Sequence, residues 1–211
     1  MAVSAEKRLA VLGASGHGKV IADLAELLGY QVTFFDARWP QVTQNGCWPV
    51  EGDEQALVSR RAEFAALVIA IGNNQVRAER QLHLEKEGFP LATLIHPSAV
   101  VSRYAKVGAG SVVFANAVIN ADARVGKGAI INTGATVDHD CQLGDFVHIS
   151  PGAHLAGNVS VGAGSWVGIG AAVRQGITIG KDVMIGAGAA VVSDIPDGLC
   201  VVGVPARPLA R

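Results

Sequence analysis

A histidine flanked by acidic residues is the feature of this sequence with the most evident chemistry. It lies in the segment TVDHDC (136–141), where Asp140 directly follows His139, and His148 comes nine residues later. A neutral imidazole accepts a proton near pH 7, and a neighbouring carboxylate fixes its tautomer and raises its basicity. The pair could therefore activate an amine or a hydroxyl toward an acyl donor. The alternative is a surface histidine that only hydrogen-bonds to its neighbours.

A glycine-rich turn, GASGHG (13–18), is the second feature that could bind a ligand. Glycines let backbone N–H groups approach a phosphate at the start of a helix. Asp36 ends the next expected strand about twenty residues later, as in dinucleotide folds. The glycine order is G-x-x-G-x-G rather than G-x-G-x-x-G, which favours a mononucleotide over NAD. An ordinary structural turn is the alternative.

The loop at Gly72 and Asn73 could also bind a ligand. Gly72 and Asn73 follow an apolar segment at 65–71, and ligands of open α/β sheets bind at the carboxyl ends of strands. An ordinary turn explains them equally well.

The chain has three cysteines and no CxxC spacing, so we expect neither a disulfide framework nor a zinc site.

The histidine segment lies in a part of the chain where apolar residues recur every six positions. From Val101 to Val191 every sixth residue is Val, Ile or Leu. This period is typical of a parallel β-helix of hexapeptides, here with about five turns of eighteen residues in a triangular column. In that frame His139 and Asp140 point outward. Cys141 points inward, which favours a buried filler over a nucleophile.

The first hundred residues follow a different pattern. Short apolar runs predict strands at 8–13, 31–36, 65–71 and 91–95, and helical spacing predicts helices at 20–28 and 75–86. Strands that alternate with helices indicate an α/β unit with a parallel, Rossmann-like sheet. We therefore expect an α/β domain at 1–97 and a β-helix domain at 98–211.

Composition restricts the partners. The net charge of −1 argues against a nucleic-acid surface, which needs a basic patch. The opening segment lacks an apolar core of signal-peptide length, and no apolar run of membrane-spanning length occurs, so we expect a soluble cytoplasmic protein. Ordering the β-helix costs about 1–2 kcal/mol of backbone entropy per residue, which its small aliphatic core does not obviously offset. We therefore expect columns to pack together as a homotrimer.

Several motifs occur together in this chain. They are ASGHG (14–18), IAIGNN-x-x-R (69–77), LIHPSA (94–99), the hexapeptides, and VVGVPAR (201–207). In this combination the chain resembles the bacterial sugar acyltransferases of the sialic acid O-acetyltransferase type. It is most similar to the N-acetyltransferases of nucleotide-linked 4-amino-4,6-dideoxy sugars, of the bacillosamine and perosamine type. The resemblance implies a left-handed β-helix, acetyl-CoA as co-substrate, no metal, and active sites between the subunits of a homotrimer.

The resemblance also implies roles for individual residues. His139 would be the general base, with Asp140 enhancing its basicity. The acetyl-CoA site would include His148, the oxyanion-binding N–H of Gly157, and main chain near Ile169 and Ala187. The nucleotide diphosphate would lie on Ser15, Gly16 and His17, and the ribose and base near Asp36, Gly72 and Asn73. Relatives with uridine substrates can show two consecutive acids where this chain has Asp36-Ala37, so UDP and GDP both stay open.

The implied reaction is acetylation of the 4-amino group of the sugar in bacterial glycan biosynthesis. Three alternatives remain at this stage. They are O-acetylation of a sialic-acid-like sugar, a non-catalytic sugar-nucleotide binding module, and a metal-dependent hydratase. The last is disfavoured because His139 and His148 are half a turn apart and so fall on different faces of one column.

Overall fold

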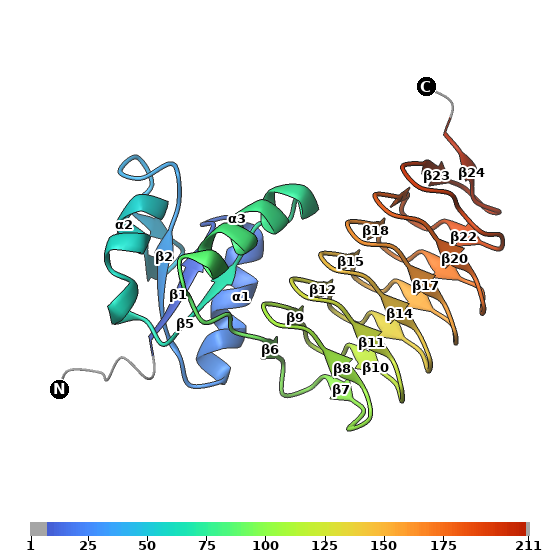
Figure 1. Cartoon of the computed structure of the whole chain (residues 1–211), viewed down its shortest axis with the longest axis horizontal. Helices are drawn as coiled ribbons and strands as arrows, with labels where there is room; N and C mark the ends of the chain where they lie inside the picture. Colours follow the sequence, from blue (N-terminus) through green and yellow to red (C-terminus); the bar gives the residue numbers. More distant parts are fainter. Residues whose placement is uncertain (1–7, 210–211) are drawn as a thin grey trace. The chain divides into compact units, whose positions relative to one another are not determined.

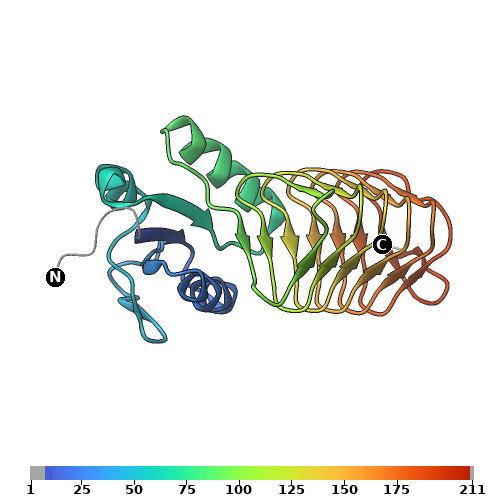
Figure 2. The same ribbon diagram turned by 90° about the horizontal axis from the view of Figure 1, so that it is seen from below.

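The computed structural model describes residues 8–209, which divide into two compact units, one ending at Leu94 and the other beginning at Ile95. The first unit is a parallel sheet in the order β2-β1-β5 with helices on both faces (Figures 1 and 2). Its elements are β1 (Arg8–Leu12), α1 (Gly16–Leu27), β2 (Gln31–Phe35), β3 (Gln44–Asn45), β4 (Trp48–Pro49), α2 (Glu54–Ser59), the 3₁₀ helix η2 (Arg61–Glu63), β5 (Ala66–Ile69) and α3 (Asn74–Lys86).

The sheet is buried on both faces, which explains why its strands read as continuous apolar runs. On one face, Leu57 of α2 and Leu84 of α3 pack in a core with Leu12 and Phe35. On the other face α1 comes so close to the sheet that a Cβ at Gly18 would lie 2.9 Å from Cε1 of Phe34. The parallel strands end at one edge, so the glycine turn after β1 and the loops after β2 and β5 lie together.

Four details of the first unit differ from the sequence expectation. The first helix begins at Gly16 rather than at residue 20, because the helix includes the two glycines that interrupt its apolar pattern. The hairpin β3-β4 and the six-residue helix α2 were not expected. The strand expected at 91–95 is shorter in the structure, where only β6 (Leu94–Ile95) is formed. Leu91 pairs with β5 as a single bridge.

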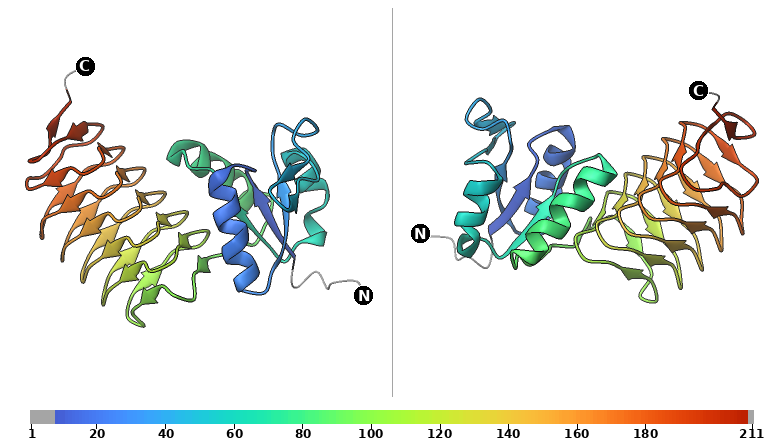
Figure 3. Two further views of the ribbon diagram at one scale, coloured as in Figure 1. Left: turned by 180° about the vertical axis from the view of Figure 1, so that it is seen from behind. Right: turned by 45° about the horizontal axis from the view of Figure 1, so that its top comes forward.

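The second unit is a β-helix whose coils stack along one axis (Figure 3). Strands eighteen residues apart pair in parallel, as Val118 does with Val100 and with Thr136. One face carries six strands, so the column is longer than the five expected turns. The three faces comprise β7 (Val100–Val101), β10 (Val118–Ile119), β13 (Thr136–Val137), β16 (His154–Leu155), β19 (Ala172–Val173) and β22 (Ala190–Val191); then β8 (Lys106–Val107), β11 (Arg124–Val125), β14 (Gln142–Leu143), β17 (Ser160–Val161) and β20 (Thr178–Ile179); and last β6, β9 (Val112–Val113), β12 (Ile130–Ile131), β15 (His148–Ile149), β18 (Trp166–Val167), β21 (Met184–Ile185), β23 (Cys200–Val202) and β24 (Arg207–Pro208).

The aliphatic residue of each hexapeptide fills the interior of the column, as the period predicts. From Val113 to Val191 every residue of the series is buried and belongs to one continuous hydrophobic cluster. Cys141 lies in the same cluster and is fully buried, and burial raises the pKa of its thiol. Its position is that of a buried filler, as expected.

Candidate active site

The side chains of His139 and Asp140 form an exposed hydrogen-bonded pair at a corner of the β-helix, directly after β13. Nδ1 of His139 lies 2.8 Å from Oδ2 of Asp140, and the two side chains are 61% and 58% exposed. This hydrogen bond is the main cause that raises the pKa of His139 above its ordinary value. Because Nδ1 faces the carboxylate, Nε2 is the nitrogen left to accept a proton. Asp140 has a φ of 62°, in the left-handed region where Asp and Asn are enriched.

Asp138 holds the backbone of this corner, a role that sequence reasoning missed. Its Oδ1 accepts hydrogen bonds from the N–H of His139 (2.9 Å) and from Nδ2 of Asn120 (2.8 Å). The bond from His139 is the main cause that lowers the pKa of Asp138. The spacing of eighteen residues between Asn120 and Asp138, one turn of the column, is the signal that could have paired them.

Gly157 lies one coil beyond His139, against its imidazole ring. A Cβ at Gly157 would lie 2.5 Å from both Cε1 and Nε2 of His139. The N–H of Asn158 donates to the carbonyl of His139 (2.9 Å), which fixes the two coils together. Within residues 8–209, the N–H of Gly157 has no hydrogen-bond acceptor. A proton-accepting nitrogen and an available backbone donor are thus adjacent.

His148 lies on a different face, in β15, and is mostly buried. Its Nε2 is 3.1 Å from Nδ2 of Asn132, whose Oδ1 accepts from the N–H of Thr133. Because the amide nitrogen donates, Nε2 of His148 accepts. The ring also packs against Trp166 with 4.2 Å between centroids and a tilt of 37°, and Nε1 of Trp166 donates to Oγ of Ser150 (2.7 Å). Sequence reasoning did not predict this contact.

One chain does not bring all the expected acetyl-CoA residues together. His139 and Gly157 share one corner of the triangle, whereas Ile169 and Ala187 lie on another and are linked by the hydrogen bond from Gly188 to Ile169. Ile169 is exposed, and so is Ala187. One chain thus presents the two sets of residues at different corners.

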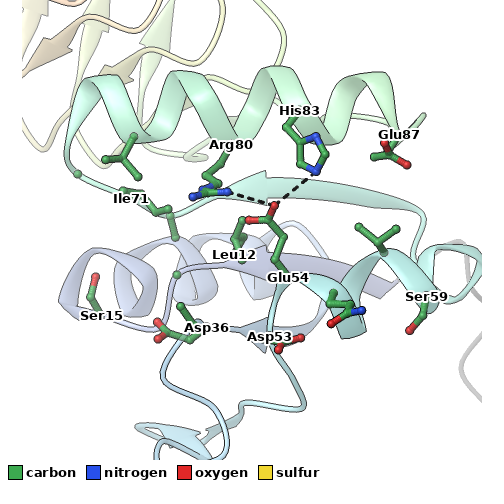
Figure 4. A pocket seen from close by; sticks show the side chains of 17 residues that line it. Leu12, Ser15, Asp36, Asp53, Glu54, Ser59, Ile71, Arg80, His83 and Glu87 are labelled. Atoms are coloured by element: carbon green, nitrogen blue, oxygen red, sulfur yellow. Dashed lines mark ion pairs between the residues drawn. The ribbon is translucent and has the colours of Figure 1, made fainter.

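The first unit contains a cavity of about 1080 Å³ at the carboxyl edge of its sheet (Figure 4). Ser15, Asp36 and Gly72 line one end of it, as their positions after the strands predict. Glu54 of α2 lies near the middle, where its carboxylate pairs with Arg80 (3.5 Å) and is 3.7 Å from Nε2 of His83 in α3 (Figure 4).

The remaining expected nucleotide-binding residues, Gly16, His17 and Asn73, do not line this cavity. Oδ1 of Asn73 caps α3 by accepting from the N–H of Val76 (3.0 Å). Burial, together with the nearby Arg77, lowers the pKa of His17 to about 4, so this imidazole is neutral at pH 7.

Arg77 organises the loop that Gly72 and Asn73 occupy. It is 1% exposed and donates to the carbonyls of Ile71 and Gly72 (3.1 Å each) and to Oδ1 of Asn74 (2.8 Å). Burial lowers its pKa to about 10, so the guanidinium stays charged at pH 7. Sequence reasoning gave Arg77 no role, although it is the last residue of the IAIGNN-x-x-R motif.

Within 8–209, no three His, Cys, Asp or Glu side chains are grouped so that they could hold a metal ion. In the same range, no helix has the length and apolar character needed to cross a membrane.

Known proteins resemble this chain over up to 96% of its length. Residues 8–82 match the family "PglD N-terminal domain". The chain is 42% identical over 120 residues to UDP-N-acetylbacillosamine N-acetyltransferase of Bacillus subtilis (strain 168), a match that spans about half the length of each protein (52%).

Two solved structures match along almost their full length. The acetyltransferase domain of PglB from Neisseria gonorrhoeae FA1090, in complex with acetyl coenzyme A, is 48% identical with a TM-score of 0.92, covering 96% of this chain and 99% of that one. The H-to-N variant of perosamine N-acetyltransferase from Caulobacter crescentus, in complex with CoA and GDP-perosamine, is 41% identical with a TM-score of 0.93, covering 96% and 97%. The chain therefore belongs to the left-handed β-helix family of sugar N-acetyltransferases that includes these two proteins.

Proposed function

We propose that this protein transfers the acetyl group of acetyl-CoA to the 4-amino group of a nucleotide-linked (UDP or GDP) 4-amino-4,6-dideoxy sugar in bacterial glycan biosynthesis. The observation that carries the proposal is the corner where His139, Asp140 and Gly157 meet. A base with a raised pKa stands there beside a backbone N–H that has no acceptor within residues 8–209. The relatives, which include complexes with acetyl coenzyme A and with GDP-perosamine, support the same reaction.

The reaction follows from general-base chemistry. Nε2 of His139 accepts a proton from the sugar amine while the amine nitrogen bonds to the thioester carbonyl carbon. The N–H of Gly157 donates to the oxyanion of the tetrahedral intermediate, a contact worth about 3–4 kcal/mol of barrier in comparable enzymes. The carbon–sulfur bond then breaks, and the departing thiolate takes the proton from His139. Asp140 stabilises the imidazolium that exists between these steps.

The nucleotide would occupy the cavity of the first unit. Its volume suits a ligand of this size. In this assignment the backbone around Ser15 and Gly16, at the start of α1, faces the diphosphate, since helix N-termini favour anions. Gly72 and Asn73 belong to the loop that Arg77 fixes, and His17 supports the glycine turn as a neutral ring.

The active form would be a homotrimer with sites between subunits. His139 and Gly157 would come from one column, and His148, Ile169 and Ala187 from its neighbour. This arrangement is needed because one chain places the two sets at different corners. The requirement for acetyl-CoA, a cytoplasmic metabolite, favours a cytoplasmic location.

The test is acetyl transfer with purified protein, acetyl-CoA, and the UDP- and GDP-linked amino sugars, monitored by CoA thiol release and by the mass of the product. We expect His139→Ala to lower turnover by about 10²–10⁴, as for a lost general base. His96→Ala is the matched control, since the side chain of His96 bonds only within its own turn, to Ser98, and the variant keeps the backbone hydrogen bonds. Absence of thiol release with every amino sugar, or full turnover by folded His139→Ala, would contradict the proposal.

A further inference from the structure

Asp36 already uses its full capacity as a hydrogen-bond acceptor. An ionised carboxylate offers about four acceptor positions. Oδ2 of Asp36 accepts from the N–H of Ala14 (2.6 Å) and from Nη2 of Arg38 (3.0 Å). Oδ1 accepts from the N–H of Arg38 (2.9 Å) and from its Nε (2.8 Å). The hydrogen bond from the side chain of Arg38 is the main cause that lowers the pKa of Asp36 to about 2.

This geometry changes the role that the sequence suggests for Asp36. In dinucleotide folds an acid at this position binds the ribose hydroxyls. Here a ribose hydroxyl would have to displace one of the four donors. Asp36 therefore acts as a positioning residue, and the group it positions is Arg38.

The guanidinium of Arg38 is hydrogen-bonded along one edge, and its other edge is open. Nε and one N–H of Nη2 bind Asp36, and Nη2 also donates to the carbonyl of Ala14 (2.7 Å). Nη1, with two N–H groups, has no acceptor within residues 8–209, and the side chain is 57% exposed. Because its rotamer is already fixed, binding a ligand through Nη1 costs little further side-chain entropy.

Arg38 is also an exposed positive charge whose side chain contacts the glycine turn. Ala14, whose carbonyl it binds, is part of that turn, and Asp36 lines the cavity with Gly13 and Ser15. Of the other basic groups nearby, His17 is neutral at pH 7 and Arg80 is paired with Glu54. Lys19 is exposed in the first turn of α1, but Arg38 is the group whose guanidinium is hydrogen-bonded to the glycine turn itself.

We infer that Arg38 binds the diphosphate of the nucleotide-linked sugar through Nη1, with Asp36 and the Ala14 carbonyl fixing its guanidinium. The inference rests on the proposed function, because it takes a nucleoside diphosphate as the ligand of the first unit. Arginine suits this role because its charge persists at any working pH and its planar fork can bind two partners at once.

The test separates the phosphates from the rest of the nucleotide. Binding of GDP and UDP, and then of guanosine or uridine, is measured by titration calorimetry for the wild type, Arg38→Gln and Asp36→Asn. We expect Arg38→Gln to weaken diphosphate binding about 10–100-fold, the size of a lost charge-assisted hydrogen bond, and to change nucleoside binding less than about twofold. Asp36→Asn should show the same selective loss. In turnover assays KM for the nucleotide sugar should rise, while KM for acetyl-CoA stays unchanged.

Lys86→Gln, at the end of α3, is the control for loss of a positive charge in the same unit. Equal loss of nucleoside and diphosphate binding by Arg38→Gln would overturn the inference, because it would mean a collapsed loop or a contact with the base. Undiminished diphosphate binding by either variant would also overturn it and leave the proposed function standing. A wild type that binds neither GDP nor UDP would instead contradict the proposed nucleotide substrate.

Discussion

At the scale of single residues, the carboxylate beside His139 should set the pH dependence of the reaction. His139 acts as a base only when neutral, so turnover should rise as the pH increases through its pKa. The hydrogen bond to Asp140 raises that pKa, which places the acid limb of the wild-type profile above about pH 6.5, the unperturbed value.

We expect Asp140→Asn to move this limb to lower pH, because the neutral amide no longer stabilises the imidazolium. Maximal turnover should fall in the same variant, since a base of lower pKa accepts the proton less readily. The measurement is kcat/KM from about pH 5 to 9 at saturating acetyl-CoA. An acid limb that stays in place would show that Asp140 does not control the titration of His139.

Residue types and spacing predicted part of this site and could not predict the rest. His139 and Asp140 are adjacent in sequence, so their contact was foreseeable. Gly157 contacts the His139 ring from the neighbouring coil. The contact is so close that a side chain at position 157 would not fit, and this closeness depends on the exact spacing between the two coils. The four donors around Asp36 come from two separate loops, and their convergence depends on loop geometry that no period encodes.

At the scale of elements, the β-helix should depend on a buried serine as well as on its aliphatic residues. Oγ of Ser165 donates to the carbonyl of Gly180 (2.7 Å) and accepts from the N–H of Val183 (2.9 Å). Ser165→Ala would leave both backbone groups buried without this partner. We expect a loss of about 1–3 kcal/mol in the free energy of unfolding, measured by urea denaturation at fixed protein concentration.

Ser160→Ala is the matched control, because Ser160 lies on β17 and is half-buried. We expect its effect to stay within about 0.5 kcal/mol. Equal stability of Ser165→Ala and the wild type would mean that water or a small shift of the coils replaces the hydroxyl.

Long regular patterns predicted elements well, and short irregular ones did not. The hexapeptide period located every coil from Val101 to Val191, because each repeat makes the same contacts with its neighbours. The helix α2 has only six residues, too few to display an apolar period, although Asp53 accepts from the N–H of Ala56 as an N-cap. α1 was placed too late because Gly16 and Gly18, two residues of low helix propensity, lie inside its first turn.

At the scale of the whole molecule, the proposed homotrimer would bring two separate corners of the column together. The corner with His139 and the corner with Ile169 are separated by a face of the triangle, and a thioester must reach both in the proposed reaction. A period of six predicts three corners but not which corner faces a neighbour. Three-fold packing of such columns would give three equivalent sites, each with residues from two chains.

Mixing two inactive variants tests this arrangement directly. His139→Ala loses the base and His148→Ala loses the proposed contact with acetyl-CoA, so each trimer alone should have low turnover. When the two chains assemble at random in equal amounts, about one site in four receives an intact His139 from one chain and an intact His148 from its neighbour. Co-expressed and co-purified mixtures should therefore recover about a quarter of wild-type turnover, whereas mixing after assembly should recover none, which is the control. If each site belonged to a single chain, every site in the mixture would carry one defect and no activity would return.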